Sequence, residues 1–305
     1  GGGSVSSGAS DQIRQLAELL QIPVMTSPQA KGIIPEGSHL ATGVNSAVGP
    51  AKTVLPDTDL LIAIGTRLSL RGISPDDMPP ILQIDVERGQ IGKHYPVELG
   101  ILGDASETLI SLISALSVDE SKLTGRRERA ERLKKQFADE VFKLASPQVS
   151  VIDKISNALP GDAIVVQGMT NIGYWSSAAL PMDRTRNYVT SSYFGTLGYA
   201  FPTALGCQTA FPERKVVALC GDGGFMYSPQ ELSTAMRYGL NTVAVVFNNG
   251  AFGASRWDQQ HQFNGRYIGT DLFNPDFVAM AKSFGAEGIK TDADNIDQGL
   301  AEALE

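Results

Sequence analysis

Two polar segments stand at the ends of two apolar stretches, and they constrain the fold more than any other feature. Residues 215–220 read Lys-Val-Val-Ala-Leu-Cys, which is typical of a short buried strand, and the strand ends directly at Gly221-Asp222-Gly223. A second apolar stretch, 242–247, ends at Asn248-Asn249. Because the carboxyl ends of parallel strands meet at one edge of a sheet, we expect both polar segments at the same edge.

The residues between these two stretches predict a connecting helix. Ser228-Pro229-Gln230-Glu231 has the pattern of a capping box with proline at the first helical position. Gly239 is placed to end the helix in a left-handed conformation. The order strand, glycine turn, helix, strand predicts one βαβ unit.

The polar groups at this edge suit a magnesium diphosphate. Mg²⁺ prefers about six oxygen ligands and takes only one or two from protein side chains, the rest from phosphate and water. Asp222, an asparagine amide oxygen and a backbone carbonyl would leave room for diphosphate oxygens. The flanking glycines, Gly221 and Gly223, let the backbone turn and approach a ligand closely. Either segment alone could be an ordinary turn, but the pair favours a metal-diphosphate site.

Composition excludes several classes of protein. A chain of 305 residues with 42% hydrophobic and 19% charged residues is sufficient for about two globular domains. A net charge of −8 argues against a nucleic-acid partner, and no apolar run reaches the roughly 20 residues of a membrane span. Cys207 and Cys220 lie in apolar stretches, which favours buried free thiols over a disulfide. With no signal peptide pattern, we expect a cytoplasmic protein.

Helices and strands alternate in both halves. The first half predicts a helix at about 9–20, with Ser10 as a candidate cap, and a closing helix at about 105–116. Its predicted strands are 23–25, 60–64, 81–84 and 100–102. The second half predicts a helix at 149–158, a strand at 163–166 and a glycine-rich loop running into a helix over 195–206. The predicted fold class is α/β, with two doubly wound parallel-sheet domains.

A charged segment separates the halves. We expect domains at 1–117 and 149–305, joined by a solvated helical linker at 118–148 in which both charge signs are mixed. The chain opens on three glycines, like the turn after a strand, and it closes on a helix without a following strand. We therefore expect a piece of a larger protein, truncated at both ends; a tag or linker is the other explanation for the glycines.

Gly-Asp-Gly followed by Asn-Asn resembles the diphosphate-binding motif of thiamine-diphosphate enzymes. The segments 198–206 and 248–257 are similar to those of the acetolactate synthase and benzoylformate decarboxylase group. The first half, with 59–67, Ile84-Asp85 and 103–105, is similar to the central, Rossmann-like domain of that group. The similarity covers nearly the whole chain.

The resemblance implies roles for individual residues. Asp222 and Asn249 would bind Mg²⁺ by side chain and Ala251 by its carbonyl. Gly223 and Gly224 would donate N–H groups to the diphosphate, with the helix that follows them. Gly221, and Asn171 beside Thr170, would make further cofactor contacts. The Gly195 carbonyl would accept from the aminopyrimidine, and Leu197 would hold the cofactor bent. An ordinary core leucine is the other interpretation of Leu197.

The resemblance also implies what these residues do not supply. Such enzymes bind the aminopyrimidine with another domain, which carries the activating glutamate, and nothing in 1–305 matches it. We therefore assign no catalytic residue to this chain. A missing segment or another chain would supply that domain, within a homodimer or homotetramer acting on a small 2-keto acid.

Two further groups of residues are weaker candidates. Trp257 and His261 follow the second asparagine segment and could face substrate, since histidine transfers protons near neutral pH. Gly65-Thr66-Arg67 and Asp85 stand at predicted strand ends and could contact FAD or an ADP group. No Gly-x-Gly-x-x-Gly follows a strand, so a structural use of these residues is favoured.

The leading functional hypothesis is an acetolactate-synthase-like enzyme that decarboxylates a 2-keto acid and adds the product to a carbonyl acceptor. A simple decarboxylase resembling benzoylformate decarboxylase is an alternative. A subunit that binds the cofactor without catalysis is another. The sequence does not name the substrate.

Overall fold

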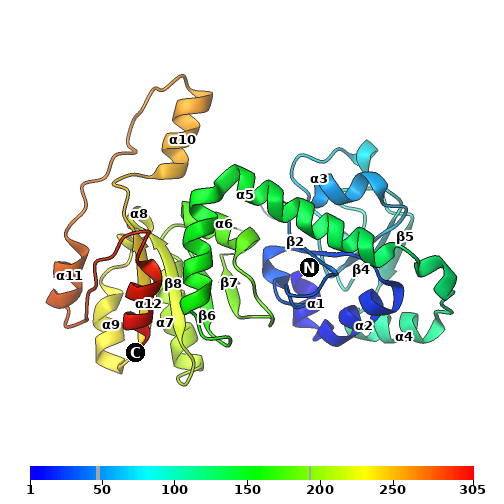
Figure 1. Cartoon of the computed structure of the whole chain (residues 1–305), viewed down its shortest axis with the longest axis horizontal. Coiled ribbons are helices and arrows are strands. Elements are labelled where there is room, and N and C mark those ends of the chain that lie inside the picture. Colours follow the sequence, from blue (N-terminus) through cyan, green and yellow to red (C-terminus); the bar gives the residue numbers. More distant parts are fainter. Residues whose placement is uncertain (46–48, 192–193) are drawn as a thin grey trace. The chain divides into compact units, whose positions relative to one another are not determined.

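The chain divides into two compact units, each built around parallel strands. The structure is a computed structural model that describes residues 1–45, 49–191 and 194–305. Unit 1 comprises Gly1–Leu144 with Pro181–Arg186, and unit 2 comprises Ala145–Leu180 with Asn187–Glu305. Figure 1 shows helices interleaved with the strands in each unit.

Unit 1 contains two parallel sheets. One pairs β1 (Val24–Thr26) with β2 (Ala41–Val44), and the other has the order β3-β4-β5. The three strands of the second sheet are β3 (Leu61–Ile64), β4 (Ile81–Asp85) and β5 (Leu99–Leu102). The helices of this unit are α1 (Gly2–Ser6), α2 (Ser10–Leu20), α3 (Ala51–Val54) and α4 (Ala105–Ala115), with 3-10 turns at Pro28–Ala30, Leu55–Asp57, Pro75–Asp77, Arg88–Gln90 and Glu120–Leu123.

The core of unit 1 joins helices α2 and α4 to the β3-β4-β5 sheet. Leu16 of α2, Ile84 of β4 and Leu109 of α4 lie in one apolar cluster, and each is almost completely buried. The apolar residues of α2 recur at three- and four-residue intervals, so they form one stripe that covers the sheet.

The charged segment between the halves belongs to α5 (Arg126–Ala158), which consists of two helices joined by a kink at Ala145, where the backbone is not helical. It is less solvated than its charges predict. Ala130, Leu133, Phe137 and Val141 are buried at helical spacing. The prediction of a solvated helix is therefore wrong for this face. In the sequence, the four apolar residues are separated by many arginines and lysines, so the apolar stripe is not obvious.

Unit 2 contains a four-stranded parallel sheet with the order β7-β6-β8-β9. Its strands are β6 (Ile164–Gln167), β7 (Tyr188–Thr190), β8 (Val216–Gly221) and β9 (Thr242–Phe247). Its helices are α6 (Asn171–Ala179), α7 (Ala200–Ala210), α8 (Asp222–Phe225), α9 (Glu231–Tyr238), α10 (Gly253–Gln262), α11 (Phe277–Ser283) and α12 (Ile296–Leu304). The named sheets of the described residues are all parallel, as the predicted α/β fold class requires.

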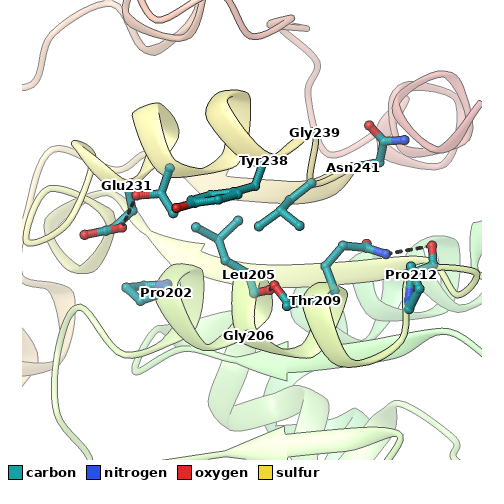
Figure 2. A pocket seen from close by; sticks show the side chains of 12 residues that line it. Pro202, Leu205, Gly206, Thr209, Pro212, Glu231, Tyr238, Gly239 and Asn241 are labelled. Carbon is teal, nitrogen blue, oxygen red and sulfur yellow. Dashed lines mark hydrogen bonds between the residues drawn. The ribbon is translucent and has the colours of Figure 1, made fainter.

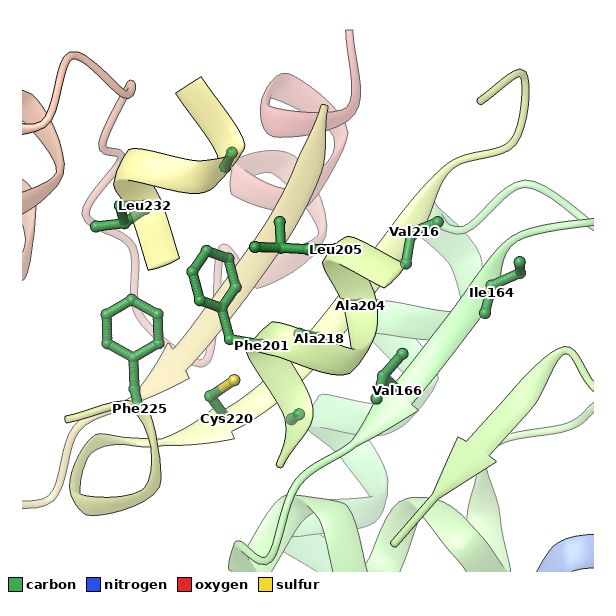
Figure 3. Packing of buried hydrophobic residues seen from close by; sticks show 12 residues of the cluster. Ile164, Val166, Phe201, Ala204, Leu205, Val216, Ala218, Cys220, Phe225 and Leu232 are labelled. Atoms are coloured by element: carbon green, nitrogen blue, oxygen red, sulfur yellow. The ribbon is translucent and has the colours of Figure 1, made fainter. Parts of the chain in front are cut away.

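Strand order makes this sheet doubly wound. The chain leaves β6 for β7 on one side, then returns through α7 to β8 on the other side of β6. Right-handed connections that run in opposite directions place α6 and α7 on opposite faces. Figure 3 shows the core on the α7 face, where Phe201 and Phe225 pack with ring centroids 5.3 Å apart above Cys220 and Ala218.

Two predicted helix caps differ from the structure. Ser10 is not a cap, because α2 is capped at Ala9 without a side-chain hydrogen bond. No capping box forms at Ser228, since α9 begins at Glu231 and the Ser228 hydroxyl donates to the Gly198 carbonyl instead. Strands β2 and β7 were not predicted. Gly239 does end α9 in the left-handed conformation, with φ of 61°.

Among the helices of residues 1–45, 49–191 and 194–305, none combines the length and apolar character that crossing a lipid bilayer demands.

Candidate functional site

The predicted site residues gather at the point where the β7-β6-β8-β9 sheet reverses its strand order. Strands β6 and β8 are neighbours, but the chain leaves them toward opposite sides of the sheet. In open α/β sheets the crevice outside the carboxyl ends at such a point is where ligands bind. The end of β8 lies close to the loop after β6, because a Cβ atom on Gly221 would lie 3.1 Å from the Thr170 hydroxyl.

Asp222 is the buried carboxylate at this edge. It directly follows β8 as the first residue of the short helix α8, and only 2% of its surface is exposed. Its Oδ1 accepts from the Gly223 N–H at 2.9 Å, and its Oδ2 accepts from the Gly250 N–H at 2.8 Å. The β8 and β9 loops are thus joined through one carboxylate.

The loop after β9 brings the two asparagines to the same edge. Gly250, with φ of 68°, turns the chain so that its N–H points back to Asp222. Asn248 and Asn249 are both exposed. The Asn249 Oδ1 accepts from the Ala251 N–H at 3.2 Å, so the predicted side-chain and carbonyl ligands lie on one tight turn.

Asn274 also lies at this edge, and it was not predicted from the sequence as a site residue. Asn274 donates from Nδ2 to Asp222 Oδ2 at 2.7 Å and to Asn248 Oδ1 at 2.8 Å. It stands 52 residues from Asp222 in the sequence, so no local spacing signals the contact. The only sequence signal nearby is the helix start at Asp276, whose carboxylate caps α11.

The segment before Asn274 closes the site on one side. Ala251 and Asp271 form an isolated antiparallel bridge, and the Leu272 N–H donates to the Gly250 carbonyl at 2.8 Å. A Cβ atom on Gly223 would lie 2.5 Å from the Phe252 ring and 2.9 Å from Leu272. Any side chain at position 223 would therefore have to displace Phe252 and Leu272, which form a wall of the site.

The remaining predicted cofactor residues lie on the segments that follow β6 and β7. The Leu197 side chain is half-buried, and its Cδ2 would lie 3.9 Å from a Cβ on Gly224. Gly195 is exposed with φ of 56°, in the loop that leads from β7 to α7. Asn171 is exposed at the start of α6, next to Thr170. The Gly223 N–H, predicted to donate to a diphosphate, here donates to Asp222.

Trp257 and His261 lie on α10, which stands off the sheet in Figure 1 and has no buried residue. Their rings stack on each other with centroids 4.2 Å apart, and His261 Nδ1 is 2.8 Å from the Trp257 carbonyl. Neither is hydrogen-bonded to the Asp222 group in the part of the chain that the structure describes. Arg256 of the same helix pairs with Asp271.

The donor set at Asp222 fits Mg²⁺ better than zinc. Within the described residues no group of three or more His, Cys, Asp or Glu side chains could hold a metal ion. A single carboxylate with amide and carbonyl oxygens suits a hard cation that takes most of its ligands from phosphate and water. Gly223 under its wall and Gly221 against Thr170 keep Cβ atoms out of the space beside the carboxylate. The residues present therefore fit a magnesium diphosphate.

A second concavity in unit 2 contains none of these residues. It is a groove between α7 and α9, lined by Pro202, Leu205, Thr209, Tyr238 and Asn241 among others (Figure 2). Gln208 closes its end by donating to the Phe211, Pro212 and Arg214 carbonyls of the turn before β8. This end lies at the amino ends of β8 and β9, at the edge of the sheet opposite Asp222.

Strand ends in unit 1 use their polar groups locally. Asp85 Oδ1 accepts from the Glu87 N–H at 3.0 Å, and the Thr66 hydroxyl accepts from the Leu68 N–H at 3.1 Å. These bonds support the interpretation that Asp85 and Thr66 stabilise their own turns, which the absence of a Gly-x-Gly-x-x-Gly pattern favoured.

Both cysteines are free thiols in unit 2. Burial raises the pKa of Cys220, in β8, to about 12. Cys207 of α7 is only half-buried, and desolvation raises its pKa as well. A thiol with a raised pKa is a poor nucleophile, so neither residue has the character of a catalytic cysteine.

The fold and this edge define a class of cofactor-binding α/β protein, and comparison with known families agrees. Residues 168–305 match the model described as thiamine pyrophosphate enzyme, C-terminal TPP binding domain. Residues 1–112 match the model described as thiamine pyrophosphate enzyme, central domain. The chain belongs to the thiamine pyrophosphate enzyme family, whose cofactor is thiamine diphosphate.

Individual relatives extend over almost the whole chain. The acetolactate synthase large subunit of Parasynechococcus marenigrum is 32% identical over 319 residues, covering 100% of this chain and 51% of the relative. That of Corynebacterium glutamicum is 32% identical over 324 residues, covering 100% and 52%. A protein of Pseudomonas aeruginosa named probable 2-ketoarginine decarboxylase is 29% identical over 305 residues, covering 98% and 54%. The chain thus spans about half the length of the curated relatives it matches.

Proposed function

We propose that this chain binds the diphosphate half of thiamine diphosphate through Mg²⁺, in an enzyme that decarboxylates a 2-keto acid and joins the product to a second carbonyl compound. The observation that carries the proposal is the convergence of Asp222 with the Asn248–Ala251 loop at the switch point of the sheet. The similarity to acetolactate synthase large subunits supports the reaction class.

Each site residue has a proposed task. Asp222 and Asn249 hold Mg²⁺ by side chain, and Ala251 holds it by its carbonyl. Gly221, Gly223 and Gly224 let the diphosphate approach the backbone, and Thr170 with Asn171 borders it from the β6 loop. The thiazolium ring, when bound, supplies the electron sink for the chemistry.

Two residues of the loop between β7 and α7 shape the rest of the cofactor site. Leu197 lies against Gly224 and is only half-buried, so it offers an apolar surface on which a ring can rest. Gly195 offers its carbonyl to the aminopyrimidine. Trp257 and His261 on exposed α10 are proposed to face substrate.

We further propose that the aminopyrimidine site and its activating glutamate lie outside residues 1–305. The match to central and C-terminal domains, over about half the length of the relatives, supports this division. Domains at 1–117 and 149–305, joined by 118–148, would then assemble with that further domain in a homodimer or homotetramer. FAD or an ADP group on unit 1 is a secondary proposal.

Calorimetric titration with thiamine diphosphate tests the cofactor proposal. We expect saturable binding in the presence of Mg²⁺ and its loss when a chelator removes the metal. Binding of equal strength with and without Mg²⁺ would contradict the proposed role of Asp222.

Product analysis with pyruvate separates the candidate reactions. Acetolactate from pyruvate alone, or a mixed product with an added acceptor aldehyde, supports carboligation. Release of acetaldehyde in both cases supports the simple decarboxylase, which the similarity to the 2-ketoarginine decarboxylase favours as a second candidate. Tight cofactor binding with neither product, even in the complete assembly, indicates a non-catalytic subunit. If residues 1–305 alone decarboxylate a 2-keto acid, the proposal of an external glutamate is wrong.

A further inference from the structure

Asn274 joins the two segments of the proposed metal site with a single amide group. Its Nδ2 lies 2.7 Å from Asp222 Oδ2 and 2.8 Å from Asn248 Oδ1. An amide nitrogen carries two hydrogens, so both are used in these contacts. Asn274 therefore binds a carboxylate and a neighbouring asparagine at the same time.

These bonds distribute the lone pairs of Asp222 unequally. Oδ2 accepts from both the Gly250 N–H and Asn274, while Oδ1 accepts from the Gly223 N–H. Each carboxylate oxygen has about two lone pairs. Within the hydrogen-bond network of residues 1–45, 49–191 and 194–305, Oδ2 is thus fully used and Oδ1 keeps one lone pair.

The same bonds distinguish the two asparagines. Asn248 Oδ1 accepts from Asn274 and, at 3.3 Å, from the Gly250 N–H, whose single hydrogen it shares with Asp222 Oδ2. Asn249 Oδ1 accepts from the Ala251 N–H at 3.2 Å. Over the described residues, both lone pairs of Asn248 Oδ1 are thus engaged, one of them in the shared bond, whereas Asn249 Oδ1 keeps one lone pair for a metal.

We propose that Asn274 is a positioning residue of the metal site, which commits Asp222 Oδ2 and Asn248 Oδ1 and so leaves Asp222 Oδ1 and Asn249 Oδ1 as the side-chain oxygens that bind the cation. The inference rests on the proposed function. A carboxylate with one available oxygen binds a metal through that oxygen alone. Mg²⁺ demands near-octahedral geometry, whereas Ca²⁺ accepts carboxylates bound through both oxygens. Asn274 therefore favours Mg²⁺ over Ca²⁺.

The wall beside the site holds Asn274 in place. The Leu272 N–H donates to the Gly250 carbonyl, and the Phe252 N–H donates to the Thr270 carbonyl, both at 2.8 Å. Asp276 then caps α11 by accepting from the Ala279 N–H at 3.0 Å. Asn274 lies between these anchors, so its amide reaches the two oxygens from a fixed backbone.

Titration of the protein with Mg²⁺ and with Ca²⁺, each at a fixed excess of thiamine diphosphate, tests this role. For Asn274→Leu we expect Mg²⁺ affinity to fall by roughly 10- to 100-fold, as when residues that orient metal ligands are removed, and Ca²⁺ affinity by less than about threefold. Asn274→Asp should lose more Mg²⁺ affinity, because a carboxylate cannot donate and would face two acceptor oxygens, Asp222 Oδ2 and Asn248 Oδ1. Asn241→Leu, on the exposed turn before β9, is the matched control and should change neither affinity.

A loss by the same factor for both metals would show a merely structural role and overturn the inference, as would no loss of Mg²⁺ affinity. A wild-type protein without metal-dependent binding would instead refute the proposed function. The asparagine pair gives a second test that leaves Asn274 in place. Asn249→Leu should weaken Mg²⁺ binding at least about tenfold more than Asn248→Leu, and the reverse order would overturn the inference.

Discussion

The two units use the carboxyl ends of their parallel strands in different ways. In unit 1, Asp85 ends β4 and Asp104 follows β5, and both accept from N–H groups only two or three residues ahead. In unit 2, Asp222 accepts from Gly250 and Asn274, which are 28 and 52 residues away. A carboxylate that serves its own turn stabilises a helix or loop end, whereas one that joins distant segments assembles a site.

Removing the Asp222 charge should give the largest difference between the units. For Asp222→Asn we expect Mg²⁺-dependent binding of thiamine diphosphate to weaken at least about 100-fold, because the metal loses its anionic ligand. Calorimetry measures this, with Asp85→Asn in unit 1 as the matched control. Equal losses of cofactor affinity for the two variants would show that Asp222 has no special role at the carboxyl ends of the strands.

Overpacking at Gly223 should come next. A methyl group there would meet the Phe252 ring and Leu272, so Gly223→Ala should lower the free energy of unfolding by about 1–3 kcal/mol and weaken cofactor binding. Gly37 in unit 1 has no atom within 4 Å of its Cβ position, so Gly37→Ala should be close to neutral. Denaturant unfolding compares the two variants, and a stable Gly223→Ala protein with normal binding would show that the wall moves freely.

One capping aspartate in each unit allows a comparison with a smaller expected effect on stability. Asp104→Ala in unit 1 and Asp276→Ala in unit 2 each remove a side-chain cap and should cost about 1 kcal/mol of stability. Only Asp276→Ala should also lower Mg²⁺ affinity, since α11 begins three residues after Asn274. A loss of Mg²⁺ affinity in Asp104→Ala would mean that unit 1 contributes to the metal site.

The smallest expected effect is a pH dependence of the free energy of unfolding that arises from the Cys220 thiol of unit 2. Its folded pKa of about 12 lies above the ordinary 9.0, so between these values the unfolded chain loses a proton that the folded chain keeps. The free energy of unfolding should therefore fall as pH rises through this range, by about 1 kcal/mol between pH 8 and 10. Urea unfolding should show this decrease in wild type relative to Cys220→Ala; parallel pH profiles would contradict it.

Sequence patterns predicted the elements whose signals are local. The apolar stretch 215–220 became β8, Gly239 ended α9, and the alternation of helices and strands yielded parallel sheets. Ser10 and Ser228 were predicted as caps by residue type, but the tertiary environment gave Ser228 another partner, the Gly198 carbonyl. The buried face of α5 was not predicted, because its four apolar residues at helical spacing are separated by many charged residues.

By itself, the sequence determined the α/β class, the family and the placement of Asp222 and the two asparagines at strand ends, because strand periodicity and turn chemistry are written in neighbouring residues. Only the tertiary structure decided which oxygens of these side chains are already committed. Asn274 and the wall at Phe252 and Leu272 reach Asp222 and Gly223 through long-range contacts, and no spacing along the chain encodes a distance in space.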